Sequence, residues 1–271
     1  MVFSPPLDLC GQYYPDHPVF VPPENPDATI WRYIDFTKFV SLLDNKRLFF
    51  APVALLDDPF EGSYPTPNLA ARKEFWAENP PAPPDEFYAE AANNIRKSIF
   101  VNSWNLSEVE SAAFWRLYVP PSGGVAIRST FRRLTDSFCI STDSDSARNL
   151  GQIHIGQVQY IDYDQTVLPE HNAFYPYVHK RRSFAFESEL RAVMSKFPLV
   201  EFQDGERTPF DLERAEPTGL RVSVDLDQLI GSIHVSPYAP PWFANLVSSV
   251  AEHYGCAASV KQSSLSAQPV F

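Results

Sequence analysis

The sequence has few of the residues from which disulfide frameworks, zinc centres and glycine-rich nucleotide loops are built. Its three cysteines lie far apart and form no Cys-x-x-Cys pair, so a disulfide framework is not expected. Its six histidines show neither His-x-x-x-His nor His-Glu-x-x-His spacing, and no metal site is therefore expected. Neither the Gly-x-Gly-x-x-Gly motif of dinucleotide-binding folds nor a Walker loop occurs among its ten glycines.

Positive charge and long apolar runs are also scarce. The 22 lysines and arginines are outnumbered by 33 aspartates and glutamates, and the formal net charge of -11 disfavours general binding to nucleic acids. No apolar stretch reaches the ~18 residues that cross a bilayer, and the first residues do not resemble a secretory signal. We therefore expect a cytoplasmic protein without membrane contact, which agrees with the odd number and wide spacing of its cysteines.

Proline is the residue in excess, with 26 in 271 residues. Seven prolines fall in residues 1–27, which predicts a Pro-rich N-terminal arm that wraps around the rest of the protein or forms a loose tail. From residue 28 onward, strand patterns alternate with amphipathic helices without strict βαβ order. The pattern predicts a strand over residues 28–35 and helices from Asn172 to Phe184 and from Trp242 to Tyr254. We predict a single α+β domain over residues 28–271, with a mixed or mainly antiparallel sheet and peripheral helices.

The most informative polar pattern lies on a strand predicted from Phe186 to Met194. Because side chains alternate along a strand, Glu187, Glu189 and Arg191 would share one face. Mutual repulsion would raise the pKa of one carboxylate, whereas the arginine would lower both. Such a pair suits one acid that orients a substrate hydroxyl and one that stabilises a developing cation. The alternative is a solvent-exposed strand with an ordinary surface ion pair.

Two further polar side chains lie on predicted strands. Arg32 is flanked by two aromatic residues, and such a guanidinium needs a carboxylate or phosphate partner. A structural ion pair with Asp35 or with a late glutamate would also meet that need. Ser103, at a strand end, has a hydroxyl that can bind a carboxylate or a ribose, or simply satisfy the strand end. The acidic loop Asp57–Glu61 is interpreted as a turn or a helix cap.

Short motifs along the chain, taken in order, resemble a widespread, mostly bacterial family that is defined only as a domain of unknown function. That family has an aromatic-Arg-Tyr strand, an Asn-Asp-Pro-Phe-Glu loop, a Trp-x-x-Tyr helix and a Glu-x-Glu-aromatic-Arg strand. The resemblance spans residues 30–265. The matching segments are Trp31–Tyr33, Leu48–Phe50, Asp57–Glu61, Val101–Trp104, Trp115–Tyr118, Gly124–Ile127 and Phe186–Arg191.

A second resemblance concerns chemistry. An arginine on the first strand, a serine on a middle strand and Glu-x-Glu on a late strand is the order seen in Arg-Ser-Glu type ADP-ribosyltransferases. The resemblance implies that Arg32 holds a phosphate or ribose of NAD and that Ser103 supports the nicotinamide ribose. It also implies that Glu189 stabilises the oxocarbenium-like transition state and that Glu187 positions the acceptor. The aromatic residues that would stack on the nicotinamide are Tyr33 and Trp104.

We therefore expect an NAD-dependent ADP-ribosyltransferase or NAD glycohydrolase with an ADP-ribosyltransferase-like fold. NAD would be its substrate, no metal would be required, and the sequence does not identify the acceptor. One alternative is a metal-dependent nuclease or phosphoesterase that assembles Mg²⁺ ligands from Asp58, Glu187, Glu189 and Lys180. Another is a non-catalytic binding module that uses the Pro-rich arm and the aromatic residues. The NAD hypothesis requires the arginine, the serine and the Glu-x-Glu pair to meet in one cleft.

Overall fold

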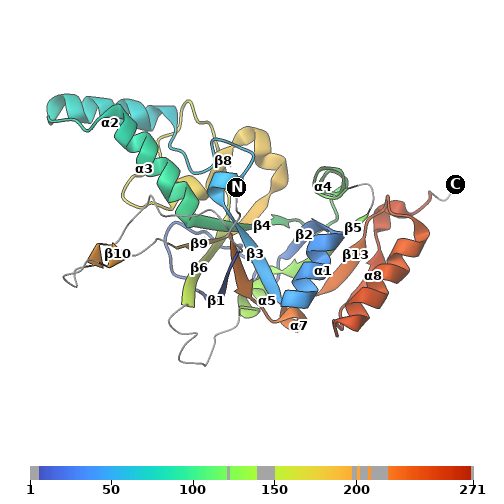
Figure 1. Ribbon diagram of the computed structural model, residues 1–271. Coiled ribbons are helices and arrows are strands. Elements are labelled where there is room, and N and C mark those ends of the chain that lie inside the picture. Colours follow the sequence, from blue (N-terminus) through green and yellow to red (C-terminus); the bar gives the residue numbers. More distant parts are fainter. Residues whose placement is uncertain are drawn as a thin grey trace.

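The computed structural model describes residues 6–120, 123–138, 150–196, 200–201, 207–208 and 219–269. Strands and helices follow one another without strict alternation, and they form one mixed α/β arrangement around a central sheet (Figure 1). The predicted mixed sheet with peripheral helices is therefore confirmed.

Six strands of this sheet close into a barrel. They are β1 (Leu7–Tyr13), β3 (Arg47–Pro52), β4 (Ile99–Leu106), β6 (Leu150–Gln157), β9 (Glu189–Ser195) and β12 (Leu220–Ser223). Their order is β4-β3-β12-β1-β6-β9, and β9 pairs again with β4 to complete the ring. β1 runs parallel to both of its neighbours, whereas the other neighbouring pairs are antiparallel.

The sheet continues beyond the barrel through four further strands. They are β2 (Thr29–Asp35), β5 (Gly124–Thr130), β13 (Ser232–Val235) and β14 (Ser259–Gln262). β2 joins the far end of β4 and pairs along its whole length with β5. Four short strands form separate pairs, β7 (Gln159–Ile161) with β8 (His179–Arg181) and β10 (Val200–Glu201) with β11 (Arg207–Thr208).

Helices surround the sheet. The α-helices are α1 (Phe36–Asn45), α2 (Thr66–Glu78), α3 (Asp85–Ser98), α4 (Ala112–Tyr118), α5 (Phe131–Asp136), α7 (Leu226–Leu229) and α8 (Pro241–His253). The 3-10 helices are η1 (Val53–Leu55), η2 (Tyr175–Tyr177), η3 (Arg182–Glu187) and η5 (Ser264–Ser266). α2 and α3 project from one end of the molecule, whereas α1 and α8 lie beside the strands outside the barrel (Figure 1). Among the described residues, no helix combines the length and the apolar composition that crossing a bilayer requires.

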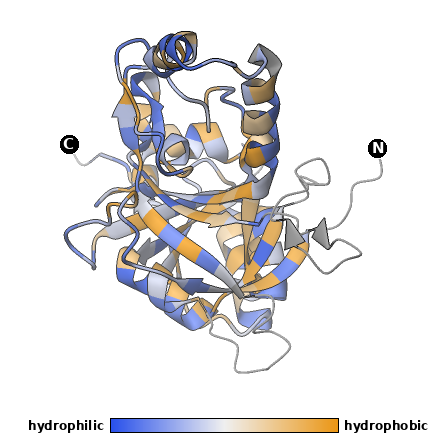
Figure 2. Ribbon diagram, turned by 90° about the vertical axis from the view of Figure 1, so that its left-hand side faces the viewer, coloured by the Kyte–Doolittle hydropathy of each residue, from blue (hydrophilic) through white to orange (hydrophobic). Residues whose placement is uncertain are grey.

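Apolar side chains fill the barrel. Hydrophobic and hydrophilic residues alternate along its strands (Figure 2), and the inward residues Leu48, Phe50, Ile153 and Val222 are all 2% exposed or less. Gly11 on β1 is required inside this ring, because a Cβ at that position would collide with Ile153 and lie 2.9 Å from Val222. Among the described residues, these side chains fill the interior of the six-stranded barrel.

Two predictions about chain segments need correction. The proposed arm, residues 1–27, contains β1, which is one of the six strands of the barrel and pairs with β12 and β6. The predicted boundary at residue 27 therefore does not separate an arm from the sheet. The helix predicted from Asn172 to Phe184 is wrong, since η2, β8 and η3 occupy that range. Pro176 provides a physical reason, because it lacks the N–H that a continuous helix requires.

Candidate functional site

A cavity opens between β2 and β3, which pair with different parts of the same edge of β4 and then diverge. β9 occupies one edge of β4 from Ile99 to Asn105. On the other edge, β3 pairs with Phe100 and Val101, whereas β2 pairs with Asn105 and Leu106. Between these pairings, residues 102–104 have no partner on that edge among the described strands. The diverging strands border a cavity of about 740 Å³.

All six residues that the NAD hypothesis assigns to its site line this cavity. They are contributed by β2, by β4, by the last residue of η3 and by the first residue of β9. They are Arg32, Tyr33, Ser103, Trp104, Glu187 and Glu189. The arginine, the serine and the Glu-x-Glu pair therefore meet in one cleft, which is the arrangement that the NAD hypothesis requires.

Arg32 reaches from β2 to the unpaired stretch of β4. Its Nη1 donates a hydrogen bond of 2.8 Å to the carbonyl oxygen of Ser103, and its guanidinium carbon lies 5.8 Å from the centre of the Trp104 ring. Burial lowers the pKa of Arg32 to about 10, so the side chain is charged at neutral pH. Among the described residues no carboxylate pairs with it, and the structural ion pair considered above is not formed.

The two predicted stacking residues are largely enclosed by protein. Tyr33 is 7% exposed, its ring packs against Trp115 at 5.0 Å, and its hydroxyl accepts a 2.7 Å hydrogen bond from the backbone N–H of Ser111. Trp104 is 2% exposed, and its Nε1 donates to Asn102 at 2.7 Å. Both rings therefore shape the cavity wall and offer little free face to a ligand.

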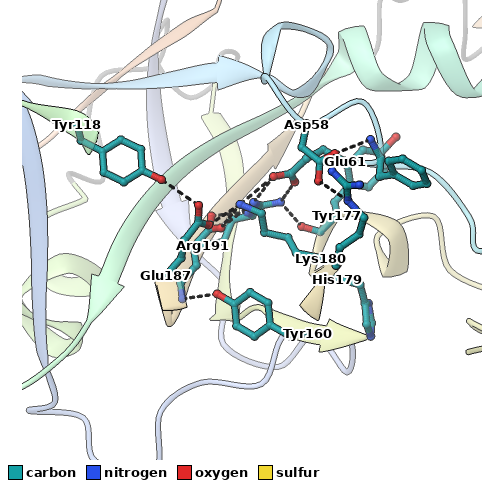
Figure 3. Close-up of polar contacts among 12 residues, drawn as sticks. Asp58, Glu61, Tyr118, Tyr160, Tyr177, His179, Lys180, Glu187 and Arg191 are labelled. Atoms are coloured by element: carbon teal, nitrogen blue, oxygen red, sulfur yellow. Dashed lines mark hydrogen bonds and ion pairs between the residues drawn. The ribbon is translucent and has the colours of Figure 1, made fainter. Parts of the chain in front are cut away.

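A network of buried charges forms another wall of the cavity (Figure 3). Arg191 on β9 donates from Nε and Nη2 to the two carboxylate oxygens of Glu189, at 2.6 and 2.8 Å. Its Nη1 donates to Glu61 at 2.6 Å. The three side chains are 4% exposed or less. This two-pronged pairing fixes the orientation of the Glu189 carboxylate.

Lys180 on β8 joins the three acids of this network. Its Nζ lies 2.5 Å from Glu187, 3.0 Å from Glu61 and 3.2 Å from Glu189. The hydroxyl of Tyr118, the last residue of α4, donates to the other oxygen of Glu187 at 2.9 Å. With Arg191, the network contains three carboxylates and two cations, which leaves one excess negative charge when all five groups are ionised.

The pKa shifts follow from this network. Burial raises the pKa of Glu189, but the charges of Arg191 and Lys180 and hydrogen bonds from Arg191 and Ser103 lower it to about 2. Burial opposes the charge of Lys180, yet the neighbouring carboxylates raise its pKa above the ordinary value. Burial and the charge of Glu187 raise the pKa of Tyr118, which keeps its hydroxyl protonated. Glu189 and Lys180 are therefore both ionised at neutral pH.

The predicted geometry of the two glutamates needs correction. Glu187 does not lie on the strand with Glu189, because it ends η3 and Ser188 then adopts a left-handed conformation with φ of 40°. This turn, rather than strand alternation, brings both carboxylates to Lys180. The solvent-exposed strand considered as the alternative is also wrong, since Glu187, Glu189 and Arg191 are 7%, 4% and 1% exposed.

Glu61 is an acid of the network that the sequence pattern did not predict. The loop Asp57–Glu61 does contain the expected turn, in which Asp58 accepts from the N–H of Phe60 at 3.1 Å. Glu61, however, reaches Arg191, far along the sequence. The available signal was Arg191 itself, because an arginine between Leu190 and Ala192 on an otherwise apolar strand requires buried acids.

The carboxylates of the metal hypothesis contact cationic side chains. Glu187 and Glu189 bind Lys180, and Asp58 binds Arg181 at 2.8 Å. Within the described part of the chain, no group of three or more histidines, cysteines, aspartates or glutamates is arranged to hold a metal ion.

No family model, curated protein or solved structure matches the chain. The interpretation of the site therefore depends on its own geometry.

Proposed function

We propose that the cleft binds NAD and that the protein is an NAD-consuming enzyme, either a glycohydrolase or an ADP-ribosyltransferase. The proposal includes the ADP-ribosyltransferase-like classification of the fold. Its main support is that Arg32, Ser103 and the two glutamates line one cavity although they lie far apart in the sequence.

The charges of the cavity complement those of NAD. The nicotinamide ring of NAD is cationic, whereas its pyrophosphate is anionic. The network around Lys180 contains one more carboxylate than cations, and Arg32 supplies a guanidinium without an acid partner among the described residues. Carboxylates held in place beforehand stabilise the positive charge that develops on the ribose when its bond to nicotinamide breaks. We assign the pyrophosphate to Arg32.

Glu187 is better placed than Glu189 to contact the ribose. Both oxygens of Glu189 are held by the Arg191 guanidinium. Among the described residues, the carboxylate of Glu187 is instead contacted by Lys180 and by the hydroxyl of Tyr118. We therefore assign the contact with the developing cation to Glu187. Glu189 is a positioning residue that orients Lys180. Glu187 therefore takes the role that the resemblance to ADP-ribosyltransferases implies for Glu189.

The proposed reaction is a substitution at the anomeric carbon of the nicotinamide ribose. The bond between that carbon and the ring nitrogen breaks, and both electrons leave with the nicotinamide, which becomes neutral. Water or a nucleophilic acceptor then adds to the ribosyl cation and releases its proton to solvent. Water gives free ADP-ribose, and an acceptor gives an ADP-ribosylated product.

The test compares nicotinamide release by the wild type and two variants. Glu187→Gln keeps the shape of the side chain but removes its charge, and we expect release to fall by about 10²-fold. Arg32→Ala removes the pyrophosphate contact, and we expect mainly a rise in KM. Release is measured by chromatography, with circular dichroism to show that the variants are folded.

Arg132→Ala is the matched control, because Arg132 forms an exposed ion pair with Asp27 outside the cavity. Its rate should equal that of the wild type. Equal rates in the wild type and in Glu187→Gln would contradict the proposal. So would a wild-type protein that releases no nicotinamide from NAD or from its phosphorylated form.

A further inference from the structure

The cavity has a second end, on the outer face of β3 and β12. Leu48 and Phe50 point into the barrel, so Arg47 and Phe49 point outward. Arg221 on β12 is the direct antiparallel partner of Phe49. All three outward residues line the same cavity as the Glu-x-Glu pair, and none of them has a role in the chemistry proposed above.

The two arginines at this end share one carboxylate. Nε of Arg221 lies 2.8 Å from Oδ1 of Asp8 on β1, and Nε of Arg47 lies 3.9 Å from the same oxygen. Nε of Arg47 is buried and has no hydrogen-bond partner among the described residues. Two cations and one anion leave an excess positive charge, and both arginine side chains are 32% exposed. Such guanidinium groups bind phosphate oxygens in pairs.

Phe49 places an aromatic ring beside these cations. It is 44% exposed, whereas Leu48 and Phe50 on either side are 2% and 0% exposed. Gly219, with a φ of +90°, lies so close to the ring that a Cβ there would be 2.5 Å from it. The ring is therefore packed against backbone and also exposed to the cavity, and an exposed aromatic ring of this kind stacks on a nucleic-acid base.

We propose that Phe49, Arg47 and Arg221 form a subsite for an adenosine whose ribose carries a phosphate. The base stacks on Phe49, and the phosphate on the ribose 2′-oxygen binds the two arginines. This phosphate is distinct from the pyrophosphate, which is assigned to Arg32. The inference rests on the proposed function and deepens it, because it makes NADP rather than NAD the preferred dinucleotide.

The spacing of the residues agrees with an extended dinucleotide. Arg47 begins β3, Ala51 is its second-last residue, and both line the cavity. Four residues of a strand span about 13 Å. Ala51 pairs with Val101, next to the stretch of β4 that carries Ser103. The cavity therefore runs along β3 from the Glu-x-Glu pair toward the arginines, so that one ligand can contact both ends.

Binding of two nucleotide probes tests the subsite without any turnover. Adenosine 2′,5′-bisphosphate carries the additional phosphate, and AMP lacks it. By calorimetry we expect the wild type to bind the bisphosphate at least about tenfold more tightly than AMP. The double variant Arg47→Ala/Arg221→Ala should remove this preference. Phe49→Ala should weaken binding of both probes about tenfold, since it removes the stacking surface.

Two exposed residues outside the cavity supply the controls. Arg132→Ala removes an exposed guanidinium, and Phe87→Ala removes an exposed ring on α3 that is 56% exposed. Both should bind the probes like the wild type. Equal affinity for the two probes, or a preference that persists in the double variant, would overturn the subsite while leaving NAD cleavage unaffected. Probe binding without nicotinamide release would instead support the subsite and contradict the proposed function.

Discussion

Arg191 is the single residue on which the buried acids of the site most depend. It is 1% exposed and donates to Glu189, to Glu61 and to the backbone carbonyl of Tyr177 (Figure 3). Lys180 contacts the same two acids but is shared with Glu187. A buried carboxylate that loses its cation retains the full penalty of being removed from water. The orientation of the two carboxylates in the cavity wall therefore depends on the Arg191 guanidinium.

Arg191→Met should reduce stability strongly. The substitution keeps much of the apolar volume, but among the described residues it leaves Glu189 and Glu61 with Lys180 as their only cationic partner. We therefore expect a loss of about 3–5 kcal/mol in the free energy of unfolding. Urea denaturation at pH 7 measures it. Arg132→Met breaks an exposed ion pair that solvent screens, and it should change stability far less than Arg191→Met. Similar values for the two variants would show that the buried network contributes no more than a surface ion pair.

At the scale of elements, Glu110 connects α4, which borders the cavity, to β13 and to the start of η5. It precedes α4, and it accepts hydrogen bonds from Nδ1 of His234 on β13 at 3.2 Å and from Ser263 and Ser264 at the start of η5. It also accepts from Nε1 of Trp115 in α4 at 3.1 Å. Because α4 ends at Tyr118, which binds Glu187, this connection supports the cavity wall from outside.

Glu110→Gln should destabilise the protein in a pH-dependent way. Burial raises the pKa of Glu110, but hydrogen bonds from His234, Ser263, Ser264 and Trp115 outweigh burial and lower the pKa from 4.5 to about 2. A lowered pKa in the folded state stabilises the protein above pH 4.5, and this contribution is lost as the pH falls toward 2. We expect Glu110→Gln to cost about 2 kcal/mol at pH 7, with a smaller cost at pH 3.

Thermal unfolding measured from pH 3 to pH 7 checks this expectation. Glu108→Gln is the matched control, because Glu108 lies in the same loop, is exposed and accepts one hydrogen bond, from Thr29. Its cost should stay below about 0.5 kcal/mol. A cost for Glu110→Gln that does not change with pH would contradict the assigned role of its charge.

At the scale of the whole molecule, local patterns predicted the elements but not their closure into a barrel. β2 and α8 lie close to their predicted bounds because their apolar residues follow strand and helix periods. β1 was missed because prolines on both sides of Leu7–Tyr13 favoured an irregular arm. Its strand conformation depends on pairing with β12 and β6, which local sequence does not encode.

The candidate site shows the same limit. Its acids and Arg32 were found from side-chain type and order, whereas their meeting in one cavity depends on the divergence of β2 and β3 from β4. The pair formed by Glu61 and Arg191 joins a loop to a strand far along the chain, and the turn at Ser188 has a backbone conformation that serine rarely adopts. Such features are set by tertiary packing, so a single sequence contains little local signal for them.

Closure of the barrel can be tested at Gly11, in the middle of β1. A side chain there would collide with Ile153 on β6 and approach Val222 on β12. Gly11→Val should therefore force these strands apart and lower the free energy of unfolding by at least about 2 kcal/mol. We expect this loss even though valine has a higher strand propensity than glycine. Gln12→Val, on the opposite, half-buried face of the same strand, should change stability by less than about 0.5 kcal/mol. Urea denaturation of both variants measures the difference. If Gly11→Val were as stable as Gln12→Val, β1 could not be a strand of a closed, packed barrel, because such an interior has no room for three additional carbon atoms.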